Sequence, residues 1–177
     1  MLFRSKAMSY GLAYGLSAYG LSQQLGISPA EATSLMDTYF ERFGGVQRYL
    51  KSVVANATRD GYTETMFGRR RYLPDLTSTV SQVRAAAERM ALNAPIQGSA
   101  ADLMKRAMLC VQEGIEREQL RSRLLLQVHD ELVLEVWPGE RSVVERVVRE
   151  GMGQAADLKV PLDVSVGFGP NWDAAAH

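Results

Sequence analysis

The segment "LLLQVHDELVLEV", residues 124–136, constrains the fold of this 177-residue chain more than any other. Two runs of apolar, partly β-branched residues flank His129, Asp130 and Glu131, which is the pattern of a β-hairpin. Solvent-facing hairpin turns usually carry Asn-Gly or Asp-Gly, and buried charges are costly unless a partner compensates them. Three titratable side chains at this turn therefore indicate a partner that the rest of the chain or a ligand supplies.

The remaining segments predict a mixed α+β fold in a single unit over residues 1–177. A capping box at Ser28 and Glu31 starts a long helix that should run to about Arg59, with Gly44-Gly45 as the site of any bend. Before this helix, the pattern predicts helices over 2–26, broken near 15–17. After it, the pattern predicts two short strands around Gly68, then helices over 78–92 and 99–118, with Pro95 disturbing the region between them. A helix over 139–152 and a strand over 161–169 should complete the chain. We expect helices packed on a small antiparallel sheet.

Composition narrows the setting of the protein. No stretch approaches the ~20 apolar residues of a membrane span, so no membrane association is expected. Cys110 is the single cysteine, which excludes an internal disulfide and a cysteine-based zinc site and favours a reducing cytoplasm. Residues 1–110 hold 13 Lys and Arg against 8 Asp and Glu, whereas residues 111–177 hold 7 against 12. The first part can therefore face a polyanion.

A stripe near the start of the chain combines a cation with aromatic rings. Lys6, Tyr10 and Tyr14 are four residues apart and so share one helix face. Such a stripe can hold a phosphate at one end and stack a base at the other, and Gly11 and Gly15 would let a flat ligand approach the backbone. The alternative is a lysine stem that covers an aromatic stripe of the core.

A second stripe carries hydrogen-bond donors for nucleic acid. Arg89, Asn93 and Gln97 follow at four-residue spacing with Arg84 upstream, although the intervening proline can move Gln97 off the stripe. Donors of this kind reach acceptors in the minor groove of any base pair. The alternative is the polar face of a surface helix. The cluster "GRRRY", Arg69–Arg71 and the tyrosine after them, fits phosphate contact or a solvated loop.

The hairpin tip is the candidate metal site. Asp130 on a rigid turn can bind Mg²⁺, which takes one or two carboxylates together with substrate phosphates. Glu131 would be an outer carboxylate and His129 a donor to a nearby phosphate. A histidine-rich metallohydrolase is excluded because His177 is the one other histidine, and no G-x-S-x-G segment supports a catalytic triad. The alternative is a merely polar turn.

Three segments in order, "KAMSYGLAYG", "RAAAERMALNAPIQGSAADLMK" and "LLLQVHDELVLEV", resemble the C-terminal part of family A DNA polymerases, the bacterial DNA polymerase I family. The resemblance runs from about Arg4 to Trp172. It implies that residues 1–60 are fingers helices and that residues 61–177 belong to the palm. It also implies primer-template DNA and deoxynucleoside triphosphates as partners, and transfer of a nucleotide to a primer 3′ end in DNA replication and repair.

The resemblance implies a role for each stripe residue at the nucleotide. Lys6 would contact the triphosphate and serve as a general acid. Tyr10 would stack beside the sugar and base, and Tyr14 would lie at the template base.

The resemblance also implies roles at the DNA and the metal. Arg89, Asn93 and Gln97 would follow the minor groove of the primer-template. Asp130 would bind the two catalytic Mg²⁺ ions with the help of Glu131, and the histidine before them would touch the primer end.

One departure from the family shapes the functional expectation. The family's first catalytic carboxylate motif, a strand-like "DYSQIE" segment upstream of the fingers helix, has no equivalent in this sequence. We therefore expect a C-terminal fragment or truncated gene product that does not polymerise DNA alone and that self-associates through exposed palm surface. The alternatives are a DNA-binding module without catalysis and an inert remnant.

Overall fold

The computed structural model describes residues 2–175, and the side chains of residues 8–175. The chain divides into two compact units, with the boundary between Ser99 and Ala100. Helices dominate both units and each unit contains one two-stranded antiparallel sheet, so the predicted α+β class is confirmed. The expected division at residue 60 into fingers and palm stays a prediction. No helix among the described residues is long and apolar enough to cross a membrane.

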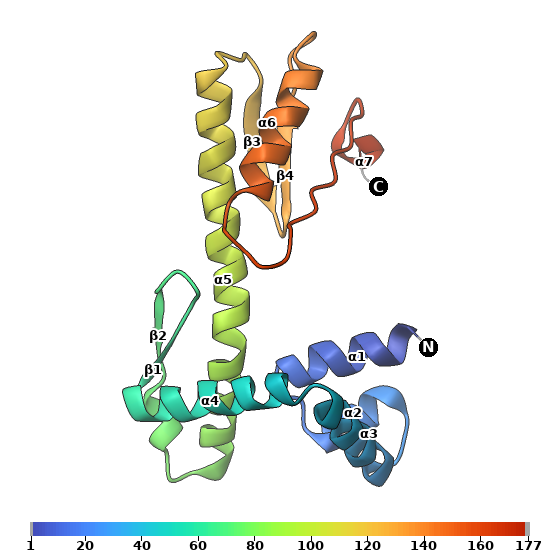
Figure 1. The fold of residues 1–177 in the computed structure, drawn as a ribbon, viewed down its shortest axis with the longest axis vertical. Coiled ribbons are helices and arrows are strands. Elements are labelled where there is room, and N and C mark those ends of the chain that lie inside the picture. Colours follow the sequence, from blue (N-terminus) through green and yellow to red (C-terminus); the bar gives the residue numbers. More distant parts are fainter. Residues whose placement is uncertain (1, 176–177) are drawn as a thin grey trace. The chain divides into compact units, whose positions relative to one another are not determined.

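The first unit begins with four helices, drawn in blue to teal in Figure 1. They are α1 (Leu2–Ala13), α2 (Ala18–Leu25), α3 (Pro29–Arg42) and α4 (Gly44–Asp60). The predicted break near residues 15–17 and the capping box that starts α3 are both confirmed. The helix predicted from residue 28 to 59 is instead two helices that meet at Phe43. Its backbone leaves helical geometry, at φ −116° and ψ 47°, and its ring packs 4.9 Å from that of Tyr39.

The two predicted strands around Gly68 are confirmed. Strands β1 (Tyr62–Glu64) and β2 (Arg70–Tyr72) pair antiparallel, and the 3₁₀ helix η1 (Pro74–Thr77) follows them. Gly68 has φ +81° in the connection, where a side chain would be strained. A small core lies beneath this region and consists of Ala57, Leu73, Leu76, Ala87 and Ala91.

The helix α5 (Ser81–Arg117) runs through the proline that was predicted to interrupt it. That prediction is wrong, although an interior proline removes one backbone hydrogen bond and costs about 3 kcal/mol or more. The helix survives because apolar side chains are buried on both sides of Pro95, among them Ala91 and Val111. Residues up to Ser99 belong to the first unit and the later ones to the second.

The second unit is built on a hairpin of β3 (Arg123–Val128) and β4 (Glu131–Glu135), followed by α6 (Arg141–Gly153) and α7 (Trp172–Ala175). Figure 1 shows α6 beside the hairpin and the last part of α5. The core comprises Val111, Ile115, Val144, Val147 and Val148, and the alternate residues Leu132, Leu134 and Val136 of the hairpin region pack on it. The predicted apolar hairpin and the helix after it are therefore confirmed.

The strand predicted over residues 161–169 is wrong. This segment forms no regular secondary structure and pairs with neither described sheet. Its alternation is nevertheless real, because Val164 and Val166 pack against the core of the second unit. The Arg149 guanidinium donates a hydrogen bond to the Val164 carbonyl. This side chain satisfies a backbone acceptor that a neighbouring strand would otherwise satisfy. The alternation thus reflects burial rather than strand pairing.

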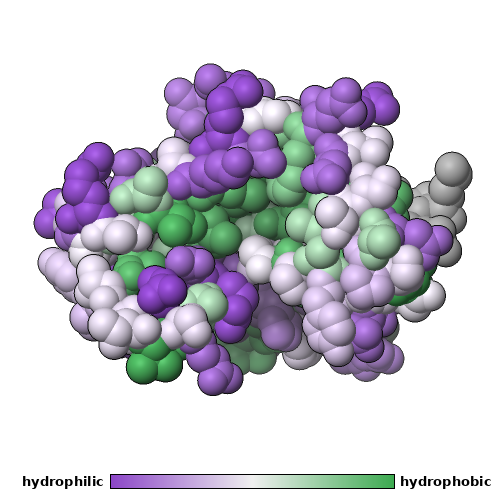
Figure 2. Space-filling view, turned by 90° about the horizontal axis from the view of Figure 1, so that it is seen from below, coloured by the Kyte–Doolittle hydropathy of each residue, from purple (hydrophilic) through white to green (hydrophobic). Residues whose placement is uncertain are grey.

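Hydrophobic side chains remain exposed in both units. Figure 2 shows one face on which hydrophobic residues lie open between hydrophilic ones. Exposed examples are Tyr19 and Tyr49 in the first unit and Leu125 and Leu126 in the second. Leu125 is the extra residue of a β-bulge, where the register shifts between Leu124 and Leu126. These side chains are available to contact further protein or ligand.

Candidate functional site

The acidic turn, which we define as His129, Asp130 and Glu131, is held by the rigid hairpin. Val128 and Glu131 form the last cross-strand pair, so two residues make the turn. His129 has φ +54°, in the left-handed region that few residues other than glycine adopt. The Gln127 side chain donates to the His129 carbonyl and supports this conformation. All three side chains of the acidic turn are exposed and can therefore meet a ligand.

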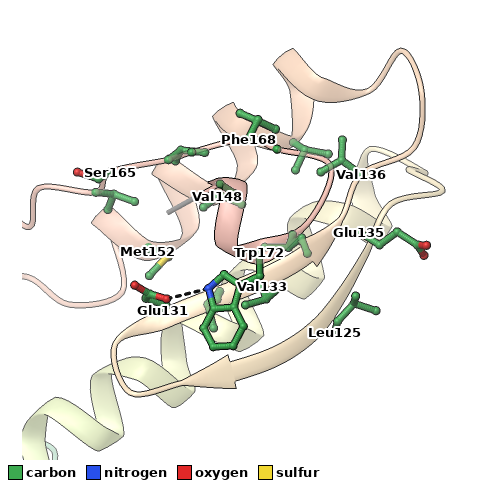
Figure 3. A pocket seen from close by; sticks show the side chains of 18 of the residues that line it. Leu125, Glu131, Val133, Glu135, Val136, Val148, Met152, Ser165, Phe168 and Trp172 are labelled. Carbon is green, nitrogen blue, oxygen red and sulfur yellow. Dashed lines mark hydrogen bonds between the residues drawn. The ribbon is translucent and has the colours of Figure 1, made fainter. Parts of the chain in front are cut away.

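A tryptophan from the end of the chain reaches the acidic turn. The Trp172 Nε1–H donates a hydrogen bond to Glu131 Oε2 at 3.2 Å, drawn as the dashed line in Figure 3. The two residues are 41 positions apart. Sequence reasoning missed this contact because Trp172 lies in a short polar segment without periodicity. A tryptophan in such a segment was the one signal available.

A cavity of about 680 Å³ lies in the second unit next to the acidic turn. The hairpin, α6 and the C-terminal segment line it, and Figure 3 shows side chains from all three. Its walls are mixed: Val133, Val148 and Met152 are among the apolar side chains, and Asp130 and Glu131 are among the carboxylates. The cavity therefore places the apolar face of the hairpin next to the carboxylates of the acidic turn.

The acidic turn fits an open divalent-metal site rather than a closed one. The described residues contain no group of three or more His, Cys, Asp or Glu side chains that could hold a metal ion. Asp130 is exposed, and Glu131 next to it has one oxygen bonded to the indole. Mg²⁺ characteristically takes one or two carboxylates and completes its shell with water and phosphate. The two carboxylates therefore fit Mg²⁺, provided that water and a phosphorylated ligand supply the remaining oxygens of its coordination shell.

The predicted donor stripe lies on α5 in the first unit. Because the helix continues past the proline, Gln97 stays one turn from Asn93, and the expected displacement of Gln97 does not occur. Arg89 and Gln97 are exposed, whereas Asn93 is half-buried and its Oδ1 has no hydrogen-bond partner among the described residues. Arg84 is half-buried, and its Nη1 donates to the Ser78 carbonyl at 2.8 Å. Arg84 thus holds the start of the helix as well as carrying charge.

The cationic cluster after Gly68 lies beside this stripe. Arg69 Nη2 donates to the Gly98 carbonyl at 3.1 Å, and Arg71 contacts the Met90 sulfur at 3.7 Å. Both arginines line a small pocket of about 80 Å³ together with Gln97. Gly98 permits this approach, since a Cβ there would lie 2.7 Å from the Thr65 methyl. The hairpin of β1 and β2 therefore adds positive charge next to Gln97. We call Arg69, Arg71, Arg89 and Gln97 the basic surface.

The aromatic stripe is partly described. Lys6 lies in α1, but its side chain is outside the described side chains. The Tyr14 N–H donates to the Tyr10 carbonyl at 3.1 Å, which confirms their one-turn spacing. Tyr10 is exposed and Tyr14 half-buried.

The glycines of this stripe serve the protein's own packing. Leu16 occupies the space beside Gly11, because a Cβ there would lie 2.7 Å from the Leu16 Cδ2. Gly15, at φ +73°, packs against Leu92 and Arg89. The backbone approach of a flat ligand that we expected at these glycines is therefore blocked by side chains. The same packing places Gly15, the residue after Tyr14, against Arg89 of the donor stripe.

Comparison with known proteins identifies the family of this chain. Residues 3–174 match the family described as DNA polymerase family A. The chain is 66% identical over 174 residues to DNA polymerase I of Mycobacterium bovis, and 50% identical over 169 residues to DNA polymerase I of Bacillus caldotenax. These stretches cover 98% and 96% of this chain but 19% of each relative.

A solved structure is similar over the same range. It is described as the POL domain of Pol1 from M. smegmatis in complex with DNA primer-template and dNTP, with 65% identity and a TM-score of 0.95. The similarity covers 98% of this chain and 31% of that one. The chain belongs to DNA polymerase family A, and it spans about a fifth of the length of the curated relatives it matches.

Proposed function

We propose that this chain is a catalytic-core segment of a DNA-directed DNA polymerase that extends a primer 3′ end in DNA replication and repair. The observation that carries the proposal is the exposed carboxylate of Asp130 on the rigid two-residue turn. Family membership supports the same function. A cytoplasmic location, where bacterial DNA and nucleotides are found, is part of this proposal.

The acidic turn would act on the reacting phosphate. Asp130 would hold Mg²⁺, with Glu131 as the adjacent carboxylate. Two such ions, when bound there, would supply Lewis-acid chemistry that lowers the pKa of the primer hydroxyl and stabilises charge on the leaving group. His129 would donate a hydrogen bond to the primer end, and Lys6 would bind the triphosphate and give a proton to the leaving pyrophosphate. The primer 3′ hydroxyl loses its proton to water, and its oxygen forms the new bond to the α-phosphorus as the bond to pyrophosphate breaks.

The first unit would hold the nucleic acid and the nucleotide. Tyr10, more than half exposed at 57%, offers a ring face for the incoming base and sugar, and Tyr14 one turn later would lie at the template base. Arg89, Asn93 and Gln97 would donate to minor-groove acceptors, which every base pair offers. Arg84 would add positive charge at the start of this stripe.

The described residues supply only part of a two-metal site. The acidic turn offers two adjacent carboxylates, and the described residues assemble no larger ligand group. A two-metal site that clamps both reacting oxygens needs further carboxylate oxygens. The isolated chain is therefore proposed to bind DNA and nucleotide without extending a primer. A DNA-binding module without catalysis is the second candidate, favoured by the exposed Arg89 and Gln97, which do not depend on the acidic turn.

Primer-template binding with nucleotide tests the first candidate against the second. Fluorescence anisotropy would follow a labelled primer-template with Mg²⁺ and either the complementary or a mismatched deoxynucleoside triphosphate. The wild-type chain should hold DNA more tightly with the complementary nucleotide, and Asp130→Asn should lose that difference. Equal binding with both nucleotides in the wild type would favour the DNA-binding module.

Primer extension provides the second arm. No extension is expected from the isolated chain. Template-directed extension that Asp130→Asn abolishes would mean that a partner copy or another residue completes the site.

A further inference from the structure

The contact between Trp172 and Glu131 connects the C-terminal segment to the acidic turn. Its N···O distance of 3.2 Å lies at the upper edge of ordinary N–H···O hydrogen bonds. Figure 3 shows the indole pointing at the Glu131 carboxylate across the cavity region. Glu131 is exposed and begins β4, so its side chain would otherwise sample several rotamers. The indole restricts this carboxylate next to Asp130.

The segment that carries Trp172 is itself held firmly. Asn171 Oδ1 accepts a hydrogen bond from the Ala174 N–H at 2.9 Å and so caps the final turn. That turn folds tightly over Gly169, where a Cβ would lie 2.6 Å from the Ala174 carbonyl carbon. The Arg141 guanidinium stacks on the Phe168 ring at 4.2 Å and ties the segment to α6. The indole is therefore presented by an anchored segment.

The other tryptophan provides a comparison within the same unit. Trp137 is nearly as exposed as Trp172, at 44% against 45%, and follows the opposite end of β4. The Arg121 guanidinium covers its ring at 3.8 Å. Trp137 therefore has a packing role away from the acidic turn and is the matched control for Trp172.

We propose that Trp172 is a positioning residue for the metal site of the acidic turn, acting through Glu131. By fixing the Glu131 carboxylate, the indole N–H lowers the ordering cost when a divalent cation binds at Asp130. Trp172 does not touch the cation. This inference rests on the proposed function, because it assumes that the acidic turn binds a divalent metal.

Mn²⁺ alone, added to the ¹⁵N-labelled full chain, tests the inference without an activity assay. Paramagnetic broadening of the amides of residues 128–132 reports binding at the turn. Trp172→Phe removes the indole donor but keeps an aromatic ring, and should raise the Mn²⁺ midpoint about 3- to 10-fold, the range expected for the loss of one ordinary hydrogen bond. Trp137→Phe should change it less than about 2-fold.

A double-mutant cycle separates positioning from general structural damage. In a Glu131→Ala background, Trp172→Phe should raise the Mn²⁺ midpoint by less than about 2-fold, because the carboxylate that Trp172 positions is absent. Similar melting temperatures of the two tryptophan variants would exclude a loss of folding as the cause.

Three results would overturn the inference in distinguishable ways. An unchanged midpoint in Trp172→Phe, with binding lost in Asp130→Asn, would remove the role of Trp172 and leave the proposed metal site intact. An undiminished effect in the Glu131→Ala background would mean that Trp172 does not act through Glu131. Absence of broadening at the turn in the wild type would overturn the metal site and the inference together.

Discussion

The Ser122 hydroxyl donates a hydrogen bond of 2.6 Å to Glu140 Oε2 and joins the start of β3 to the start of α6. The same carboxylate accepts from the backbone N–H groups of Arg121 and Ser122. Ser122 is buried, and its Oγ also accepts from the backbone N–H of Trp137 at 2.8 Å. This junction fixes the end of the hairpin that is opposite to the acidic turn.

Stability should depend on the ionisation of Glu140. The hydrogen bonds from the Arg121 N–H and the Ser122 hydroxyl hold the pKa of the Glu140 carboxyl below its ordinary 4.5. Because the folded-state pKa is lowered, this stabilisation is complete above pH 4.5 and is lost as the pH falls through the folded-state value. Glu140→Gln should lower the melting temperature at neutral pH.

Melting curves followed by circular dichroism across this range test the prediction. The difference between wild type and Glu140→Gln should shrink below pH 4.5. Glu113→Gln, at an exposed position of α5, is the control and should leave the pH profile unchanged. A difference that persists undiminished in acid would contradict the assignment to the ionised carboxylate.

The close packing of α5 and α6 predicts a glycine-specific effect. A Cβ at Gly151 would lie 3.0 Å from the backbone nitrogen of Val111, and backbone cannot move aside as a side chain can. Gly151→Ala should therefore destabilise the chain by about 1–3 kcal/mol. Gly153→Ala in the same helix meets its nearest atom at 3.7 Å and should be neutral or stabilise by up to about 1 kcal/mol. Urea unfolding of both variants measures the contrast.

Substitution of His129, the residue of the acidic turn with a left-handed backbone, should affect DNA binding more than stability. His129 and Gln119 have nearly equal φ values, +54° and +53°, so glycine relieves similar strain at both positions. His129→Gly and Gln119→Gly should each change stability by no more than about 1 kcal/mol, because the relieved strain offsets the added freedom of the unfolded chain. Only His129→Gly should weaken primer-template binding. Equal binding losses would argue against a role for His129 at the DNA.

The basic surface predicts salt-dependent DNA binding. The double variant Arg89→Ala with Gln97→Ala should raise the dissociation constant for primer-template about 5- to 50-fold. The salt dependence of binding should also become less steep, because the variant loses one positive charge that faces the DNA and displaces counterions. Arg59→Gln, which removes an exposed arginine paired with Asp60, is the control and should have little effect. Unchanged affinity in the double variant would assign DNA binding to another surface.

The exposed apolar hairpin predicts self-association. Leu125 and Leu126 are half exposed, at 50% and 55%. We expect light scattering after size-exclusion chromatography to show a concentration-dependent increase in mass, reduced in Leu126→Ser. Val160→Ser changes a side chain that is 70% exposed outside the hairpin and should leave the mass unchanged. A monomer at all concentrations would contradict the prediction.

The sequence by itself determined the local elements and the chemistry of the motifs. The capping residues at Ser28 and Glu31 specify their helix start through contacts three residues apart, and they form as predicted. The two hairpins also follow from short strand-like runs that are close in the chain, with Gly68 marking the turn of the first. The order of three motifs was sufficient to indicate the polymerase family that the comparisons establish. Such features depend on neighbouring residues, so sequence patterns describe them well.

Only the tertiary structure decided the features that depend on distant residues. Pro95 stays within a continuous helix because apolar groups buried on both sides of it offset its lost hydrogen bond. The alternation of Val164 and Val166 serves burial against α6 and its neighbours, since the segment has no strand partner among the described residues. Trp172 reaches Glu131 through contacts that join residues 41 positions apart. Local periodicity can indicate that a residue is buried, but it does not predict which distant residues cover it or accept its hydrogen bonds, because these contacts form only in the folded chain.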